Sequence, residues 1–261
     1  MFRRARTVAC ARAVLVALLL SAALLPAQTK TLRIAAAADL QPVLPAFVHN
    51  FEQSSGTKVE VSYASSATLT TQILNGAPYD LFLAANLAFP QKIVAAGLAV
   101  ESAPLTYAQG SLVLWARTGV LPHSLAMQSL TDPFVHRIAV ANPVHAPYGA
   151  AAMAAIQSLG LAKALHSKLV FAENIAQAAE FGQSGNADCA LISKTLAITP
   201  TMRQAGRFAP IPENAYPPIR QGAVILRGAL HRHQAQAFLR YLQSPAGSHL
   251  LLVSGLQPPS H

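Results

Sequence analysis

Residues 63–86 read YASSATLTTQILNGAPYDLFLAAN and predict a strand end, a helix and a second strand. Ser65 and Ser66 introduce a helix predicted from about Thr68 to Leu74, because small hydroxyl residues favour helix N-termini. A Gly-Ala-Pro turn ends this helix, and the apolar run after it is typical of a buried strand. No acid, base or thiol stands at the head of the stretch, so nothing beside the two serines could activate them as nucleophiles.

The same alternation extends upstream of this stretch. Residues 32–36 predict a first strand, and apolar positions between 43 and 51 follow at helical spacing. Residues 59–63 alternate apolar and polar side chains and predict the next strand. Asp39 lies where the N-cap of the first helix belongs. Strand, helix and strand in this order indicate a parallel sheet wound with helices.

A second set of strands and helices follows Gly110, so the sequence predicts two similar α/β lobes. The predicted strands are 111–116, 136–142, 168–173, 187–193 and 222–228, and the predicted helices are 151–159, 174–184 and a terminal pair broken near Pro245. Cys189 lies in one of the apolar runs, where a buried small hydrophobic residue is expected.

The N-terminus has the three-part pattern of a secretory signal. A basic head with four arginines precedes an apolar run at 13–25, and a small residue, Ala27, follows. We therefore expect residues 1–27 to be removed on export, with a retained N-terminal anchor as the alternative. Removal would take away four of the positive charges that make up the formal net charge of +9. It would also remove Cys10 and leave Cys189 without an intramolecular disulfide partner.

The chain lacks the sequence marks of several function classes. Its basic residues are scattered and form no stripe with interleaved aromatics, so we expect no nucleic-acid partner. No phosphate-binding glycine loop, zinc motif or nucleophile elbow occurs, so we expect no resident cofactor, no protein-coordinated metal and no catalytic residue. Only His231 and His233 lie close together among the nine histidines, and two such residues are more often solvated than metal-bound.

What recurs is a strand that ends in small or hydroxyl residues and opens a helix. This happens at residues 35–40, 63–69, 142–152 and 171–177. Each junction directs free backbone N–H groups toward the carboxyl edge of a sheet, where ligands bind in open α/β folds. Four such junctions predict an anion site built without a buried cation. The competing interpretation is that each serine only caps its own helix.

These junctions, together with GNADCALIS (185–193) and YPPIRQGAVIL (216–226), resemble the periplasmic molybdate-binding proteins of ABC importers. The resemblance runs in order over nearly all of residues 31–257. It implies a type II periplasmic-binding fold, with two lobes, each a mostly parallel sheet flanked by helices, and a ligand cleft between them. The implied lobes are 28–109 with 221–261, and 110–220. The implied partners are a small oxyanion, molybdate or tungstate, and a membrane permease. The implied state is a periplasmic monomer.

The resemblance also carries over site residues. The oxyanion of such proteins is held by backbone N–H groups and hydroxyls, and the matching positions here are Asp39 with Ala38 before it, Ser66 with Ser65 beside it, Tyr148, Ile175 and Ser193. Tyr148 and Ile175 are expected to act through their backbone N–H groups.

Two of these positions depart from the family pattern. Many relatives have serine where this chain has Asp39, and a carboxylate that faces a dianion is unfavourable in a low-dielectric cleft. Asp39 therefore either turns away to cap its helix or faces the ligand, where an ionised carboxylate would favour a protonated oxyanion such as hydrogen phosphate. The second departure is Ser193, which replaces a tyrosine and shortens the reach of that hydroxyl.

The resulting expectation is an exported receptor that captures molybdate, and by size and charge tungstate, for a membrane importer. One alternative keeps the fold and changes the ligand to phosphate or sulfate, and Asp39 is the residue that decides between them. A second alternative is an exported hydrolase that uses the same cleft. That interpretation needs an activated serine, and no His or Lys lies beside Ser65, Ser66 or Ser193 in a sequence pattern that would provide one.

Overall fold

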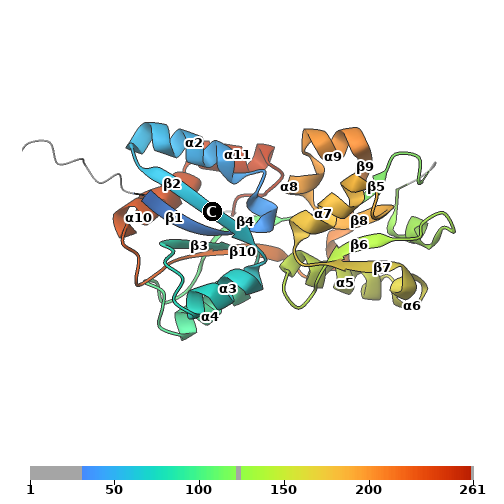
Figure 1. Cartoon of the computed structure of the whole chain (residues 1–261), viewed down its shortest axis with the longest axis horizontal. Helices are drawn as coiled ribbons and strands as arrows, with labels where there is room; N and C mark the ends of the chain where they lie inside the picture. Colours follow the sequence, from blue (N-terminus) through green and yellow to red (C-terminus); the bar gives the residue numbers. More distant parts are fainter. Residues whose placement is uncertain (1–30, 122–124, 260–261) are drawn as a thin grey trace, which may run out of the picture. The chain divides into compact units, whose positions relative to one another are not determined.

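The computed structural model describes residues 31–121 and 125–259. From Thr31 onward the chain forms one unit that contains two five-stranded sheets (Figure 1). Each sheet has helices packed against it, which confirms the predicted α/β class. The predicted signal segment, residues 1–27, lies outside the described residues. In the part of the chain that the structure describes, no helix is long and apolar enough to cross a membrane.

The first sheet has the strand order β2-β1-β3-β10-β4. Its strands are β1 (Thr31–Ala37), β2 (Lys58–Ala64), β3 (Leu81–Ala84), β4 (Leu105–Gly110) and β10 (Ile219–Ile225). β1 pairs in parallel with β2 and β3, as predicted, whereas β10 runs antiparallel to both β3 and β4. The sheet is therefore mixed, because β10 returns from the other lobe and inserts between β3 and β4 rather than continuing the strand-helix alternation.

The second sheet repeats this plan with the order β7-β6-β8-β5-β9. Its strands are β5 (Leu112–Arg117), β6 (Ile138–Ala141), β7 (Leu169–Ala172), β8 (Cys189–Ser193) and β9 (Gly206–Pro210). β6 pairs in parallel with β7 and β8, and β5 runs antiparallel to β8 and β9. In each sheet three neighbouring strands are parallel and the next strand runs against them, which agrees with the prediction of two similar lobes.

Most of the helices lie where the hydrophobic periodicity of the sequence predicts them. The α-helices are α2 (Leu44–Ser55), α3 (Ser66–Leu74), α4 (Ala88–Ala95), α5 (Pro147–Ser158), α6 (Ala162–Leu165), α7 (Ile175–Ser184), α8 (Lys194–Ala197), α9 (Pro200–Ala205), α10 (Arg232–Leu242) and α11 (Pro245–Val253). Short 3-10 turns are η1 (Ala38–Leu40), η2 (Met127–Thr131), η3 (His166–Lys168) and η4 (Glu213–Ala215). The terminal pair breaks at Pro245, as predicted, with the Ser244 side chain capping α11.

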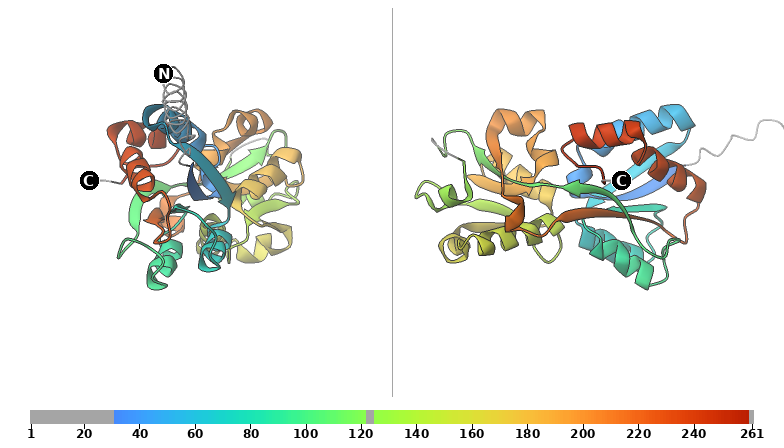
Figure 2. Two further views of the ribbon diagram at one scale, coloured as in Figure 1. Left: turned by 60° about the vertical axis from the view of Figure 1, so that its left-hand side comes forward. Right: turned by 180° about the vertical axis from the view of Figure 1, so that it is seen from behind.

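The chain passes between the two sheets twice (Figure 2). It leaves the first sheet between Gly110 and Leu112 and returns to it between Pro210 and Ile219. These crossings lie close to the predicted lobe boundaries at 109/110 and 220/221, and the boundaries themselves stay a prediction.

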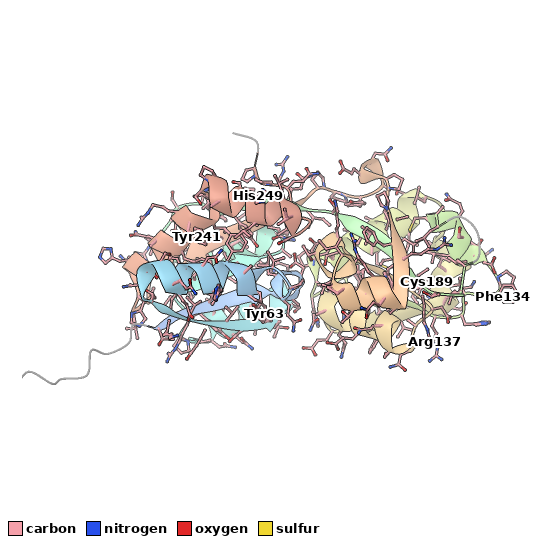
Figure 3. All side chains as sticks on the ribbon, turned by 90° about the horizontal axis from the view of Figure 1, so that it is seen from above. Tyr63, Phe134, Arg137, Cys189, Tyr241 and His249 are labelled. Carbon is pink, nitrogen blue, oxygen red and sulfur yellow. The ribbon has the colours of Figure 1, made fainter. Side chains whose placement is uncertain are left out.

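Each lobe has its own buried core. In the second lobe Trp115 is fully buried, and its indole N–H donates to the Met202 carbonyl at 3.0 Å. Cys189 lies in the same core on β8 (Figure 3), which confirms the expectation of a small buried residue. Burial raises the pKa of its thiol to about 12, so the thiolate that reactive cysteines need is not formed at neutral pH.

Candidate oxyanion site between the lobes

At the predicted strand-helix junctions, three helices begin with a backbone N–H group that has no hydrogen-bond acceptor within the described residues. These groups belong to Ser66 in α3, Tyr148 in α5 and Ile175 in α7. In α7 the Asn174 side chain accepts the next two N–H groups, both at 3.0 Å, and leaves only that of Ile175. Unpaired N–H groups at helix starts carry partial positive charge and suit an anion.

Hydrogen bonds between the lobes bring the predicted junctions together. The Ala67 N–H at the start of α3 donates to the His145 carbonyl, just before α5, at 3.2 Å. The Thr195 hydroxyl at the start of α8 donates to the Asp39 carbonyl at 2.7 Å. η1, which contains Asp39, also packs against α7. Four strand-helix junctions from two sheets therefore meet in a closed arrangement of the lobes.

Asp39 is fully buried at the centre of this arrangement. Its Oδ2 accepts a hydrogen bond from the Gln221 amide at 2.5 Å, and the Tyr107 hydroxyl orients that amide by donating to its oxygen at 2.8 Å. Its Oδ1 is buried and has no partner among residues 31–121 and 125–259. Burial raises the pKa of Asp39 to about 7 and outweighs the opposing hydrogen bond from Gln221.

The prediction that Asp39 caps the following helix is wrong. Asp39 lies in η1, which ends at Leu40, and α2 begins only at Leu44 with no side-chain cap. The carboxylate instead accepts from Gln221, 182 residues away in the chain. The reason is tertiary: the fold brings β10 within reach of η1, so the carboxyl group bonds to the Gln221 amide and does not cap α2.

The two serines of the 63–86 stretch have different roles. The Ser65 Oγ accepts from the Thr68 N–H at 3.1 Å and caps α3, which is the structural role expected of such a residue. The Ser66 Oγ accepts from the Ala85 N–H at 3.1 Å, and its hydroxyl hydrogen has no acceptor in the described part of the chain. Ser66 therefore offers both a backbone and a side-chain donor at the same point, and Ser65 supports its helix.

Comparisons with known proteins show the family to which the chain belongs. Residues 32–257 match the family described as bacterial extracellular solute-binding protein. The chain belongs to this family. The molybdate-binding protein ModA of Azotobacter vinelandii is 36% identical over 230 residues, which cover 88% of this chain and 90% of that protein. ModA of Rhodobacter capsulatus is 34% identical over a match that covers 78% of this chain and 79% of that protein.

A solved structure supports the fold of this solute-binding protein. The periplasmic molybdate-binding protein of Azotobacter vinelandii superimposes with a TM-score of 0.82 at 30% sequence identity. The match covers 88% of this chain and 100% of that one. The two-lobed class predicted from the sequence is thereby confirmed.

Ser193 has a structural contact in this solute-binding protein that the sequence did not predict. Its hydroxyl lies 2.8 Å from that of Thr195, whose single hydroxyl hydrogen goes to the Asp39 carbonyl. Ser193 is then the donor of the shared bond, so its own hydrogen is directed to Thr195. That it contacts a ligand stays a prediction, and its observed contact braces α8 against η1.

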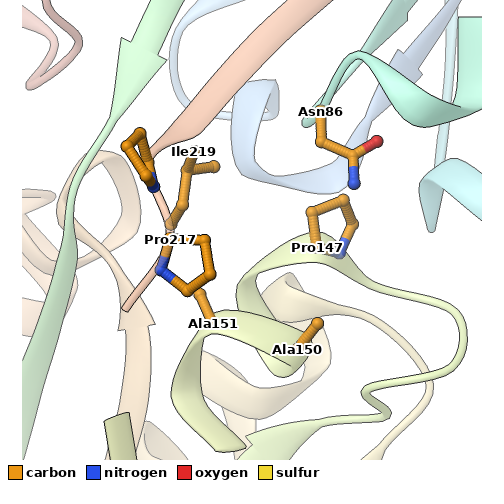
Figure 4. Close-up of a pocket in the computed structure, with 7 residues that line it drawn as sticks. Asn86, Pro147, Ala150, Ala151, Pro217 and Ile219 are labelled. Atoms are coloured by element: carbon orange, nitrogen blue, oxygen red, sulfur yellow. The ribbon is translucent and has the colours of Figure 1, made fainter. Parts of the chain in front are cut away.

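A pocket opens beside the start of α5, between the two lobes (Figure 4). Asn86, which follows β3, faces Pro147 across it, and Pro217 and Ile219 of the second crossing form another wall. The remaining lining residues are Ala150, Ala151 and Pro218. Pro147, which lines the pocket, directly precedes Tyr148 in α5.

Three residues of the buried network were not predicted from the sequence: Gln221, Tyr107 and Thr195. Gln221 and Tyr107 lie inside strands, and neither has a neighbouring polar pattern that would mark it. Thr195 follows Ser193 in a short helix that the apolar pattern did not predict. The only sequence signal for Gln221 was its place in the YPPIRQGAVIL stretch that carried the family resemblance.

Proposed function

We propose that this solute-binding protein is exported to the periplasm, captures molybdate between its lobes and delivers it to an ABC importer in the membrane. The observation that carries the proposal is the set of unpaired N–H groups of Ser66, Tyr148 and Ile175, joined by the Ser66 hydroxyl. Such donors hold a dehydrated dianion without a cation. The names of the similar proteins support molybdate as the anion.

Several finer points belong to the same proposal. Tungstate, which has the size and charge of molybdate, is a second ligand. The contact set is Asp39, Ser66, Tyr148, Ile175 and Ser193, with Ala38 and Ser65 in support. Ser193 contacts the anion by turning its hydroxyl hydrogen away from Thr195. Residues 1–27 direct export, the mature chain is a monomer, and it needs neither a resident cofactor nor nucleic acid. The protein is a carrier and not an enzyme: none of the described His residues bonds to Ser66 or Ser193.

Closure of the lobes is the step that would report occupancy to the permease. The hydrogen bonds from Ala67 to His145 and from Thr195 to Asp39 form only when the lobes meet. A ligand that touches both lobes favours this closed state by its greater affinity for it.

The second candidate ligand is a protonated oxyanion such as hydrogen phosphate. The observation that favours it is the buried Asp39, because an ionised carboxylate can accept a hydrogen bond but not donate one. A fully deprotonated dianion would be repelled by that charge.

Titration calorimetry of the mature chain, from about Gln28, separates these ligands. We expect molybdate and tungstate to bind, and sulfate and phosphate to bind at least about 100-fold more weakly, a difference of about 2.7 kcal/mol. Phosphate binding without molybdate binding would replace the proposed ligand by the second candidate. No heat with any of the four anions would contradict the proposed function.

Gly110→Ala tests closure at the first crossing. A Cβ atom on Gly110 would overlap the Tyr148 hydroxyl oxygen and lie 2.9 Å from its Cζ atom. Overpacking of this kind costs about 1–3 kcal/mol, so we expect molybdate to bind about 5- to 150-fold more weakly in calorimetry. Gly228→Ala is the matched control, because a Cβ there meets nothing within 4 Å. Equal losses in both variants would show that Tyr148 placement does not control binding.

A further inference from the structure

The Asp39 carboxyl group has one satisfied oxygen and one unsatisfied oxygen, and both are fixed by the fold. Oδ2 already accepts from the Gln221 amide, so a proton on the carboxyl group would sit on Oδ1. Oδ1 is buried and has no partner in the described residues. A native protein rarely leaves a buried carboxyl oxygen unpaired unless a ligand, ion or water completes it.

The surroundings of Asp39 are uncharged, which disfavours its ionised form. Two tyrosines face it: Tyr107 and Tyr148, whose pKa values burial raises well above the usual range, so both stay neutral. The elements around η1 carry further titratable groups, which are Lys58, Glu60 and Tyr63 on β2, Glu180 on α7, Lys194 on α8 and Arg220 on β10. None of these is a cause of the raised Asp39 pKa, and the five charged ones are solvent-exposed.

We propose that Asp39 carries a proton on Oδ1 when the oxyanion is bound, and that this O–H group donates a hydrogen bond to the anion. The inference rests on the proposed function and adds a residue that couples anion capture to proton uptake. The proton comes from solvent, since molybdate is a dianion through neutral and alkaline pH. The carboxyl oxygen then serves as a neutral donor beside the N–H groups of Ser66, Tyr148 and Ile175.

This placement also gives Asp39 a role in ligand selection. A protonated carboxyl group donates to an oxyanion that bears no hydrogen, whereas a hydrogen phosphate would bring a donor of its own. A site that offers the ligand only hydrogen-bond donors has no acceptor for an O–H group of the ligand. The unpaired O–H group then lowers the affinity for that ligand relative to a similar ligand without it. Protonated Asp39 therefore favours molybdate and tungstate over hydrogen phosphate.

The proposal predicts a measurable proton count. Burial places the pKa of Asp39 at about 7 in the ligand-free closed form, and an adjacent dianion raises it further. Above about pH 7, binding must then take up close to one proton, and the affinity for molybdate must fall about tenfold for each pH unit. Below about pH 6 the group is already protonated, so neither uptake nor a pH slope is expected.

Calorimetry of the mature chain with molybdate, in two buffers of different ionisation enthalpy at about pH 6 and about pH 8.5, counts these protons. We expect nearly one proton at the higher pH and nearly none at the lower. Asp39→Asn, whose amide donates permanently, should bind with no proton uptake and no pH slope. Glu213→Gln, a carboxyl-to-amide change at an exposed position, should behave as wild type. An infrared difference spectrum of the complex at about pH 8.5 should show a protonated carboxyl C=O band that Asp39→Asn lacks.

The outcomes separate this inference from the function on which it rests. Molybdate binding by wild type without proton uptake, or an unchanged carboxyl band in Asp39→Asn, overturns the inference and leaves the proposed function in place. Absence of binding with all four oxyanions at both pH values overturns the proposed function itself. The wild-type proton count decides the matter even where Asp39→Asn does not fold.

Discussion

Asp39→Asn is expected to be more stable than wild type at neutral pH, by up to about 4 kcal/mol in the free energy of unfolding. Burial raises the pKa of Asp39 from 3.8 to about 7, and one pKa unit corresponds to about 1.36 kcal/mol. The folded state holds this proton more tightly than the unfolded state, so wild-type stability falls as pH rises from about 4 to about 7 and the loss is complete above that range. The amide has no such titration. Urea unfolding of the ligand-free chains at about pH 5 and about pH 8 measures the difference.

The comparison needs a carboxyl-to-amide control that changes no buried group. Glu213→Gln removes a carboxylate at an exposed position and should keep the pH profile of wild type. Because all other acids titrate alike in the three proteins, the difference between the profiles isolates Asp39. If the free energy of unfolding changed with pH in the same way for wild type and Asp39→Asn, burial of an ionised Asp39 would not destabilise the ligand-free protein.

Local patterns in the sequence were enough to predict most of the elements. Alternation at residues 59–63 predicted β2, and the stretch at 63–86 predicted α3 and β3, because hydroxyl residues, helical spacing and a Gly-Ala-Pro turn act within a few residues of one another. Local patterns could not predict that β10 pairs antiparallel with β3. It depends on pairing between Ala223 and Leu83, which are far apart in the chain. The two crossings entered the prediction only through the family resemblance.

The candidate site divides in the same way. The family resemblance identified Ser66, Tyr148 and Ile175 as site positions, and the local sequence had already marked a helix start at each of them. Gln221 was missed because its importance comes from a bond to Asp39 across 182 residues of chain. The same bond explains why the capping role predicted for Asp39 was wrong. Local spacing identified Asp39 as a helix-cap position, but its carboxylate accepts from the Gln221 amide, which is distant in the sequence.

Gln221→Leu is expected to lower the free energy of unfolding by about 3 kcal/mol. The Gln221 amide donates to the Asp39 carboxylate and to the Tyr148 hydroxyl at 3.3 Å, and it accepts from Tyr107. Leucine has a similar volume but removes all these bonds, and each buried polar group left without a partner costs about 1–3 kcal/mol. Urea unfolding at about pH 8, where Asp39 is ionised, gives the largest loss, since the stranded group is then a charge.

The matched control is Gln183→Leu, which makes the same change at an exposed position of α7 and should alter stability by less than about 0.5 kcal/mol. A second comparison tests the network itself. Tyr107→Phe removes the hydroxyl that Gln221→Leu would strand, so the double variant should lose less than the sum of the two single losses. Strictly additive losses would mean that Tyr107 and Gln221 act independently, and the oriented amide could not then be what holds Asp39 in place.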